Sequence, residues 1–290
     1  MIKQEFGPLV QSVYAALEGN SFVRFGMEDS PIWEPPMAGF AAGDDPIFSS
    51  YKQAVGPLHW TPEEAWAAGT GRTVPAGQLT VFSLVFPQAE ETVRAQAGQT
   101  GGPALRWAYS RNTWNGLNAA FCRALLAALG ARGVEGIAPD QLPAFRAMVR
   151  EGAHAPYAFW SHRHAAHAAG LGSFGLSDGL ITRRGKAVRC TSLILKGRWP
   201  ADPRPYDGPY GWCLYHRDGS CGLCADRCPA GALTRGGGHD KAKCEAWLDR
   251  CDAALAGRAD LDHSIEVGCG LCQAAVPCAR QCPVEGGWEE

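Results

Sequence analysis

The spacing of the cysteines constrains this chain more than any other feature of its sequence. The tetrapeptide Cys-Gly-Leu-Cys occurs twice, at Cys221–Cys224 and at Cys269–Cys272, and ten of the twelve cysteines lie at or after position 213. Thiolate pairs at this spacing hold iron-sulfur cubanes, and a Cys-Pro a few residues on, here Cys228-Pro229, sends its sulfur to a different cluster in two-cluster ferredoxins. Zinc also binds Cys-x-x-Cys pairs, but it takes four sulfurs and needs no Cys-Pro. We therefore expect two [4Fe-4S] clusters in the last third of the chain.

The assignment of ligands follows the standard bacterial run of cluster cysteines. The first position of that run falls on Asp218, so the nearest upstream cysteine is expected to complete the set. One cluster is assigned to Cys213, Cys221, Cys224 and a cysteine returning from the second motif, either Cys278 or Cys282. The other cluster is assigned to Cys228, Cys244, Cys269 and Cys272. Cys251 is then spare.

Charge and hydropathy restrict the partners. The chain carries 27 basic and 29 acidic residues, so we expect neither a nucleic-acid surface nor a polybasic membrane patch. The longest apolar runs, such as Leu79 to Phe86, are too short to span a bilayer. The N-terminal residues lack the features of a secretory signal, and close Cys-x-x-Cys pairs are typical of metal sites in reducing compartments. We expect a cytoplasmic protein.

Hydrophobic periodicity predicts an α/β domain before the cluster region. Helices are expected from Phe6 to Leu17, Asn118 to Leu129, Leu142 to Arg150 and Ser161 to Ala169, and buried strands from Gln78 to Phe86 and Val188 to Leu195. The stretch from Ser30 to Arg72 shows neither period and is interpreted as a long ordered excursion. Prolines and glycines around residue 205 predict a boundary between a domain over 1–207 and a cluster domain over 208–290.

A glycine-rich segment is the most distinctive part of the first domain. Gly170-x-Gly172-x-x-Gly175 satisfies the dinucleotide fingerprint literally. That fingerprint must follow a strand and open a helix, whereas this one follows a helix and leads toward a strand, so a Rossmann site is rejected. The remaining interpretation is backbone that turns tightly or approaches a flat ligand closely.

Taken together, these motifs resemble epoxyqueuosine reductase and its relatives, the reductive dehalogenases. The resemblance covers roughly residues 75 to 283 and is carried by the following segments: Ala168 to Gly175, Tyr109-Ser110-Arg111, Cys228-Pro229-Ala230-Gly231-Ala232 and Lys243-Cys244. It implies a nitroreductase-like α/β domain that holds a corrinoid (cobalamin) in its base-off form, and a ferredoxin-like α+β domain whose two clusters pass electrons to cobalt. The cluster that includes Cys228 and Cys244 would lie nearer the corrinoid. An external low-potential donor, such as ferredoxin or flavodoxin, would supply the electrons, and a small molecule would be the substrate.

The resemblance also implies site residues. The expected cofactor-binding residues are Arg163, Gly170, Leu171, Gly172, Ser173, Phe174 and Gly175. The family's proton-donating aspartate aligns with Pro156, and of its Glu-Arg pair only Arg163 is kept, beside His162. These departures argue against epoxyqueuosine itself as the substrate.

A general acid is still required for reduction at cobalt, and it should titrate near the working pH. His154, Tyr157 and His162 are the expected catalytic residues, with His164 nearby. His162, His164 and His167 could alternatively be surface or hydrogen-bonded side chains, and a metal site on them is disfavoured because no carboxylate accompanies them in sequence. Two other functions stay open: an electron-transfer protein without its own substrate, and a pocket for a ligand other than a corrinoid.

Overall fold

A computed structural model describes residues 1–145 and 158–284 of the chain. Its centre is a four-stranded sheet with the order β1-β2-β6-β3, in which all described pairs are antiparallel. Two short strands, β4 and β5, form a second sheet. The strands are β1 (Met37–Ala42), β2 (Leu79–Pro87), β3 (Gly136–Ile137), β4 (Gly172–Phe174), β5 (Leu180–Thr182) and β6 (Val188–Lys196). The mixed α/β class expected from the sequence is confirmed.

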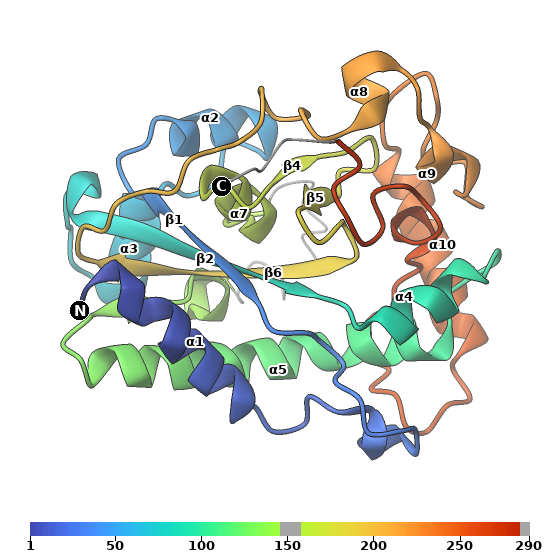
Figure 1. Cartoon of the computed structure of the whole chain (residues 1–290), viewed down its shortest axis with the longest axis horizontal. Coiled ribbons are helices and arrows are strands. Elements are labelled where there is room, and N and C mark those ends of the chain that lie inside the picture. Colours follow the sequence, from blue (N-terminus) through green and yellow to red (C-terminus); the bar gives the residue numbers. More distant parts are fainter. Residues whose placement is uncertain (146–157, 285–290) are drawn as a thin grey trace.

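Helices cover both faces of the central sheet (Figure 1). The helices are α1 (Phe6–Ala15), α2 (Ile47–Ala54), α3 (Pro62–Thr70), α4 (Glu90–Ala97), α5 (Leu105–Gly130), α7 (His162–Ala168), α8 (Leu214–Asp218), α9 (Leu223–Asp226) and α10 (Lys241–Ala254). Short 3₁₀ turns are η1 (Lys3–Glu5), η2 (Phe22–Phe25), η3 (Ala76–Gln78), η4 (Pro139–Gln141) and η5 (Leu271–Gln273). Within the described residues, no helix is both apolar enough and long enough to cross a bilayer.

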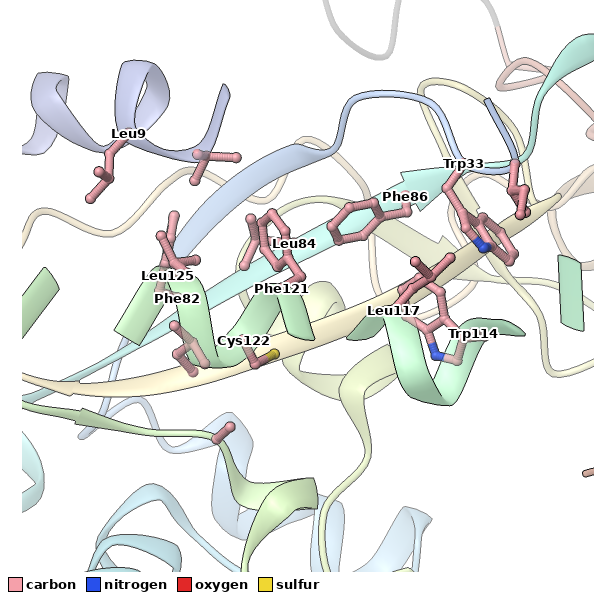
Figure 2. Close-up of a cluster of buried hydrophobic side chains, with 14 of the residues drawn as sticks. Leu9, Trp33, Phe82, Leu84, Phe86, Trp114, Leu117, Phe121, Cys122 and Leu125 are labelled. Carbon is pink, nitrogen blue, oxygen red and sulfur yellow. The ribbon is translucent and has the colours of Figure 1, made fainter. Parts of the chain in front are cut away.

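The main hydrophobic core lies between the sheet and the layer made by α1 and α5 (Figure 2). Strand β2 is buried along its whole length, and its alternate residues face opposite sides. Phe82 and Leu84 point toward Phe121 and Leu125 of α5, whereas Val81 packs with the core on the α7 side. The two apolar runs predicted as buried strands are therefore β2 and β6.

The stretch from Ser30 to Arg72 was predicted wrongly, because it contains β1, α2 and α3. Strand β1 is rich in small residues, and a Cβ atom on Gly39 would lie 2.5 Å from the carbonyl oxygen of Ala169. These small side chains let the chain beyond α7 pack against the strand. They also remove the alternation of large apolar and polar side chains by which a strand is recognised in a sequence. Helix α3 does carry a local signal, since Thr61 and Glu64 form a capping box around Pro62.

Helix α5 is twice as long as the sequence predicts. Its first half carries polar residues that are buried against the cysteine-rich part of the chain. The Nδ2 group of Asn112 donates to the carbonyl oxygen of Asp262 at 2.8 Å, and the amide of Asp262 donates back to Asn112 at 3.0 Å. A helix buried on both sides by such contacts has no clear hydrophobic stripe. The predicted helix over Leu142 to Arg150 falls largely outside the described residues.

The cysteine-rich part shares packing with the rest of the chain. Leu261 and Val267 belong to the same hydrophobic cluster as Leu125, and Leu176 and Ile181 pack with Cys213 and Cys224. Beyond residue 207 the described elements are α8, α9, α10, η5 and one isolated bridge between Leu233 and His239. The predicted boundary between 207 and 208 stays a prediction.

Candidate functional site

Four cysteines line one small hollow of about 20 Å³. They are Cys213, which precedes α8; Cys221, in the loop before α9; Cys224, within α9; and Cys278, from the C-terminal loop. Leu176, Ile181 and Trp212 belong to the hydrophobic cluster around it. Burial raises the pKa of Cys278 to about 11, with further upward contributions from Cys224, Cys213 and Cys221. The four sulfurs therefore lie close enough together to surround one shared group.

Cys278 and Cys282 have different surroundings in the structure, a difference that the sequence could not predict. Cys282 does not line the hollow. Its Sγ donates to the carbonyl oxygen of Val284 at 3.7 Å, and burial raises its pKa to about 11 with lesser influences from Val284 and Arg217. Of these two cysteines, Cys278 is the one that lines the hollow with Cys213, Cys221 and Cys224.

The second set contains the four expected cysteines and a fifth. Burial raises the pKa of Cys272, and Cys269 and Cys228 lie near enough to raise it further. Helix α10 carries Cys244 and Cys251 seven residues apart, which places both on one face. Hydrogen bonding between Cys251 and Cys269 holds the pKa of Cys251 below its usual range and that of Cys269 above it. Cys251, treated as spare from the sequence, therefore lies within this second set.

A larger cavity of about 650 Å³ lies beside the second set. Its lining includes side chains from α5, η4, the start of α7 and β6, and it also includes Cys272 of η5. Three polar atoms that line it are buried and have no hydrogen-bond partner among the described residues: Arg111 Nη1, Asp140 Oδ1 and His162 Nε2. Buried polar groups are normally paired, so such a lining is typical of a ligand site.

Lys186 lines both the four-cysteine hollow and the large cavity. Its side chain is buried, and Nζ donates to Ser177 Oγ at 2.5 Å. Burial by itself would lower the pKa of Lys186, but the neighbouring thiol groups, led by Cys278 and Cys272, outweigh burial and raise it. Lys186 thus stands between the two sites. Nothing in the local sequence singled out this lysine.

His162 takes part in a buried polar chain at the wall of the large cavity. Its Nδ1 is 2.8 Å from Ser192 Oγ, which also accepts from Trp160 Nε1 at 2.9 Å. Its Nε2 is 3.4 Å from Asp140 Oδ2, a distance at which a protonated imidazole forms an ion pair. The sequence interpretation that no carboxylate accompanies the histidines is wrong, because Asp140 approaches from η4, 22 residues earlier.

Asp140 is held in its charged form. Burial would raise its pKa, but His162 and the hydrogen bond from Gln141 outweigh burial, so the pKa lies below its usual range. Asn118 Nδ2 and Gln141 Nε2 each donate to Asp140 Oδ2 at 2.8 Å. A buried carboxylate with these donors can orient an imidazole and stabilise its protonated form.

The three histidines of α7 do not converge. His164 Nδ1 lies 2.8 Å from Ser161 Oγ, and His167 Nδ1 lies 2.9 Å from the hydroxyl of Tyr51. Burial lowers the pKa of His164 to about 3 and that of His167 to about 4, so both are neutral near pH 7. Across the residues described here, no group of three or more His, Cys, Asp or Glu side chains could hold a single metal ion. His154 and Tyr157 lie outside the described residues.

The glycine-rich segment follows α7 and leads into β4, as predicted, but it is packed against the chain itself. A Cβ atom on Gly170 would lie 2.1 Å from the carbonyl oxygen of Pro203, and one on Gly172 would lie 2.4 Å from that of Ile181. Gly175 lines the four-cysteine hollow. The absence of side chains here serves close backbone packing.

The other expected cofactor residues are divided between packing and the cavity. Arg163 lines the cavity, and its Nη1 donates to the carbonyl oxygen of Asp178 at 2.5 Å. Ser173 Oγ accepts from the amide of Trp212 at 2.9 Å, the amide of Phe174 donates to Pro209, and Leu171 packs against the core around α7. Of the expected set, Arg163 is thus the member that the structure places on the large cavity.

Together, the fold and the two cysteine sets describe a mixed α/β protein with a candidate redox-metal site beside a ligand cavity. No family model matches the sequence. Among curated proteins, the chain is 38% identical over 77 residues to an uncharacterized protein of Geobacillus stearothermophilus and 32% identical over 120 residues to an epoxyqueuosine reductase of Bacillus anthracis. These matches cover 26% and 40% of this chain, and they span about a third of each relative, 33% and 29%.

Solved structures extend the likeness to most of the chain. An epoxyqueuosine reductase matches with a TM-score of 0.54 at 15% identity, over 95% of this chain and 66% of that one. An epoxyqueuosine reductase with an epoxyqueuosine-modified tRNA stem loop matches with a TM-score of 0.51 at 13% identity, over 94% and 66%. A catabolic reductive dehalogenase matches with a TM-score of 0.50 at 18% identity, over 87% and 31%. The resemblance seen in the sequence is thus confirmed in the fold, which is that of epoxyqueuosine reductases and reductive dehalogenases. Since one of these proteins was solved with RNA, the expectation that nucleic acid is not a partner lacks support.

Proposed function

We propose that this protein is an iron-sulfur reductase. Two [4Fe-4S] clusters held by the C-terminal cysteines would deliver electrons to a base-off corrinoid in the large cavity, where a small substrate is reduced. The observation that carries the proposal is the shared wall between the sites: Lys186 lines both the four-cysteine hollow and the cavity, and Cys272 of the second set lines the cavity as well. Electron carriers and a reaction chamber would then be in direct contact.

The cysteine sets fit cubanes. Cys213, Cys221, Cys224 and Cys278 would hold one cluster, and the second would be held by Cys228, Cys269 and Cys272 with Cys244 or Cys251 on α10. Cluster ligation requires thiolates, and the Lys186 ammonium favours negative charge on the sulfurs around it. In this arrangement the second cluster lies nearer the cavity, because Cys272 belongs to it.

The cavity lining suits a large polar cofactor. The unpaired Oδ1 atom of Asp140 can accept a hydrogen bond from the amide side chains of a corrinoid, and Arg163 adds a donor. When bound, the clusters would supply single electrons and the corrinoid would supply a strongly reducing cobalt centre. A low-potential donor such as ferredoxin or flavodoxin would reduce the clusters again after each turnover. Cytoplasmic location remains part of the proposal, since cluster thiols stay reduced there.

In this proposal His162 delivers the proton that the reduction consumes. Its side chain lines the cavity, Ser192 fixes one ring nitrogen, and the Asp140 carboxylate lies 3.4 Å from the other. The pair thus replaces the family's aspartate, which aligns with Pro156 in this chain. His154 and Tyr157 stay candidates for the same role on sequence grounds alone.

Substitution His162→Asn is expected to lower the turnover of a substrate found by anaerobic screening by roughly 10² to 10⁴ fold, the usual contribution of a general acid. Asp140→Asn should cause a smaller loss, because the imidazole remains but loses its orienting carboxylate. Exposed His263 does not line the cavity, so His263→Asn is the matched control and should keep full activity. Iron content and cofactor uptake, measured on each variant, should be unchanged. Full turnover by His162→Asn would exclude the assigned role.

A further inference from the structure

The large cavity carries more positive charge than its own carboxylates neutralise. Four basic side chains line it, Arg111, Arg163, Lys186 and Arg189, whereas Asp140 is the acidic side chain among the described lining residues. Asp140 is already occupied by hydrogen bonds from Asn118 and Gln141 and by His162. Lys186 faces the four-cysteine hollow as well, and its Nζ donates to Ser177 Oγ. Three guanidinium groups are left on the cavity wall.

These three arginines lie near one another. Burial, with the neighbouring Arg111 and Arg163, lowers the pKa of Arg189 to about 9, while Glu266 opposes them. Neither Arg111 nor Arg189 forms an ion pair within residues 1–145 and 158–284, with Glu266 or any other carboxylate there. Arg163 donates to a neutral backbone carbonyl. Within the described residues, no carboxylate thus forms an ion pair with Arg111 or Arg189.

Such a group of guanidinium side chains suits an anionic ligand. Arginine forks match the planar oxygens of carboxylates and phosphates. Arg111 Nη1, buried and without a partner, can donate to such a group.

We propose that the substrate reduced in this cavity carries an anionic group, a phosphate or a carboxylate, which binds between Arg111, Arg163 and Arg189. This inference rests on the proposed function in taking the cavity as the substrate site. The ligand class it names is a small organic anion, and a cationic or neutral substrate would bind poorly here. The anionic end would lie against β6 and α5, with the reducible end toward His162 and Asp140.

The test is anion binding to the full chain, purified without oxygen and with its metal content intact. Inorganic phosphate, acetate and tetramethylammonium are titrated at constant ionic strength, and heat release and thermal stability are recorded. Phosphate or acetate should bind, and the tighter of the two identifies the group. Arg189→Gln and Arg111→Gln should each weaken binding by about tenfold or more, since a charge-assisted hydrogen bond is lost.

Matched variants separate the inference from its alternatives. Arg123 lies on the same helix as Arg111 but is exposed and does not line the cavity, so Arg123→Gln should bind anions as the unaltered chain does. Arg189→Lys keeps the charge but loses the fork, and it should give intermediate affinity if Arg189→Gln does not fold. Equal anion binding by all variants, or binding of none of the anions, would overturn the inference. Iron content is measured on the same samples, so a chain without clusters that still binds anions through Arg189 would refute the proposed function alone.

Discussion

Substitution Cys278→Ala is expected to remove one of the two proposed clusters and to lower the iron content from roughly eight to roughly four atoms per chain. The reason is geometric: Cys278 lines the hollow with Cys213, Cys221 and Cys224, and loss of one of four sulfurs leaves an iron corner without its ligand. The measurement is iron and acid-labile sulfide per chain after anaerobic purification. Electron paramagnetic resonance of the reduced protein should show one cluster signal in place of two interacting ones.

Cys282→Ala is the matched control for this experiment. Cys282 lies four residues further on, is also buried and also belongs to the C-terminal loop, but its sulfur is directed to the carbonyl oxygen of Val284. Iron content should therefore stay at the level of the unaltered chain. If Cys282→Ala loses iron and Cys278→Ala retains it, the assignment of the first cysteine set is wrong.

Substitution Gly170→Ala is expected to destabilise the protein by about 2 to 5 kcal/mol. The backbone at Gly170 has a φ of +75°, which costs an alanine roughly 1 to 2 kcal/mol. The added methyl group would also lie 2.1 Å from the carbonyl oxygen of Pro203, and relief of such overpacking costs roughly 1 to 3 kcal/mol more. Circular dichroism during anaerobic heating measures the effect as a lower Tm.

Gly208→Ala is the control for the cost of placing an alanine at a positive φ. Gly208 also has a positive φ, +68°, but an added Cβ atom would meet nothing within 4 Å. Its Tm should therefore exceed that of Gly170→Ala by roughly 2 to 12 °C. Equal Tm values would show that Gly170 faces open space, as it would if the segment were the surface on which a flat ligand rests.

Local patterns predicted the parts of this protein that depend on local physics. The apolar runs of β2 and β6, the amphipathic repeat of α1 and the position of α7 were visible because each element buries a simple stripe or an entire strand. Cysteine spacing predicted that Cys221 lies with Cys224 and Cys269 with Cys272, since Cys-x-x-Cys geometry is set within a few residues. Local spacing could not decide whether Cys278 or Cys282 joins the first cysteine set. The two cysteines are only four residues apart, so the chain could bring either one to that set.

Features made by tertiary contact were missed. Asp140 lies beside His162 but belongs to another element of the fold. The pKa of Lys186 is raised by four cysteines that lie 27 to 92 residues further along the sequence. The first half of α5 was overlooked because buried Asn112 and Ser110 replace the usual apolar stripe with hydrogen bonds. The glycines after α7 were correctly recognised as unusual. The structure packs Gly170 and Gly172 against the chain's own backbone.

The proposed function depends most directly on the metal held by the C-terminal cysteines. The decisive measurement is the iron, sulfide, cobalt and zinc content of the chain purified without oxygen, with electron paramagnetic resonance before and after reduction. We expect a brown protein with roughly eight irons and eight sulfides per chain, and a base-off cobalt(II) signal once a corrinoid is supplied. A colourless protein, or one whose cysteines hold zinc, would contradict the account.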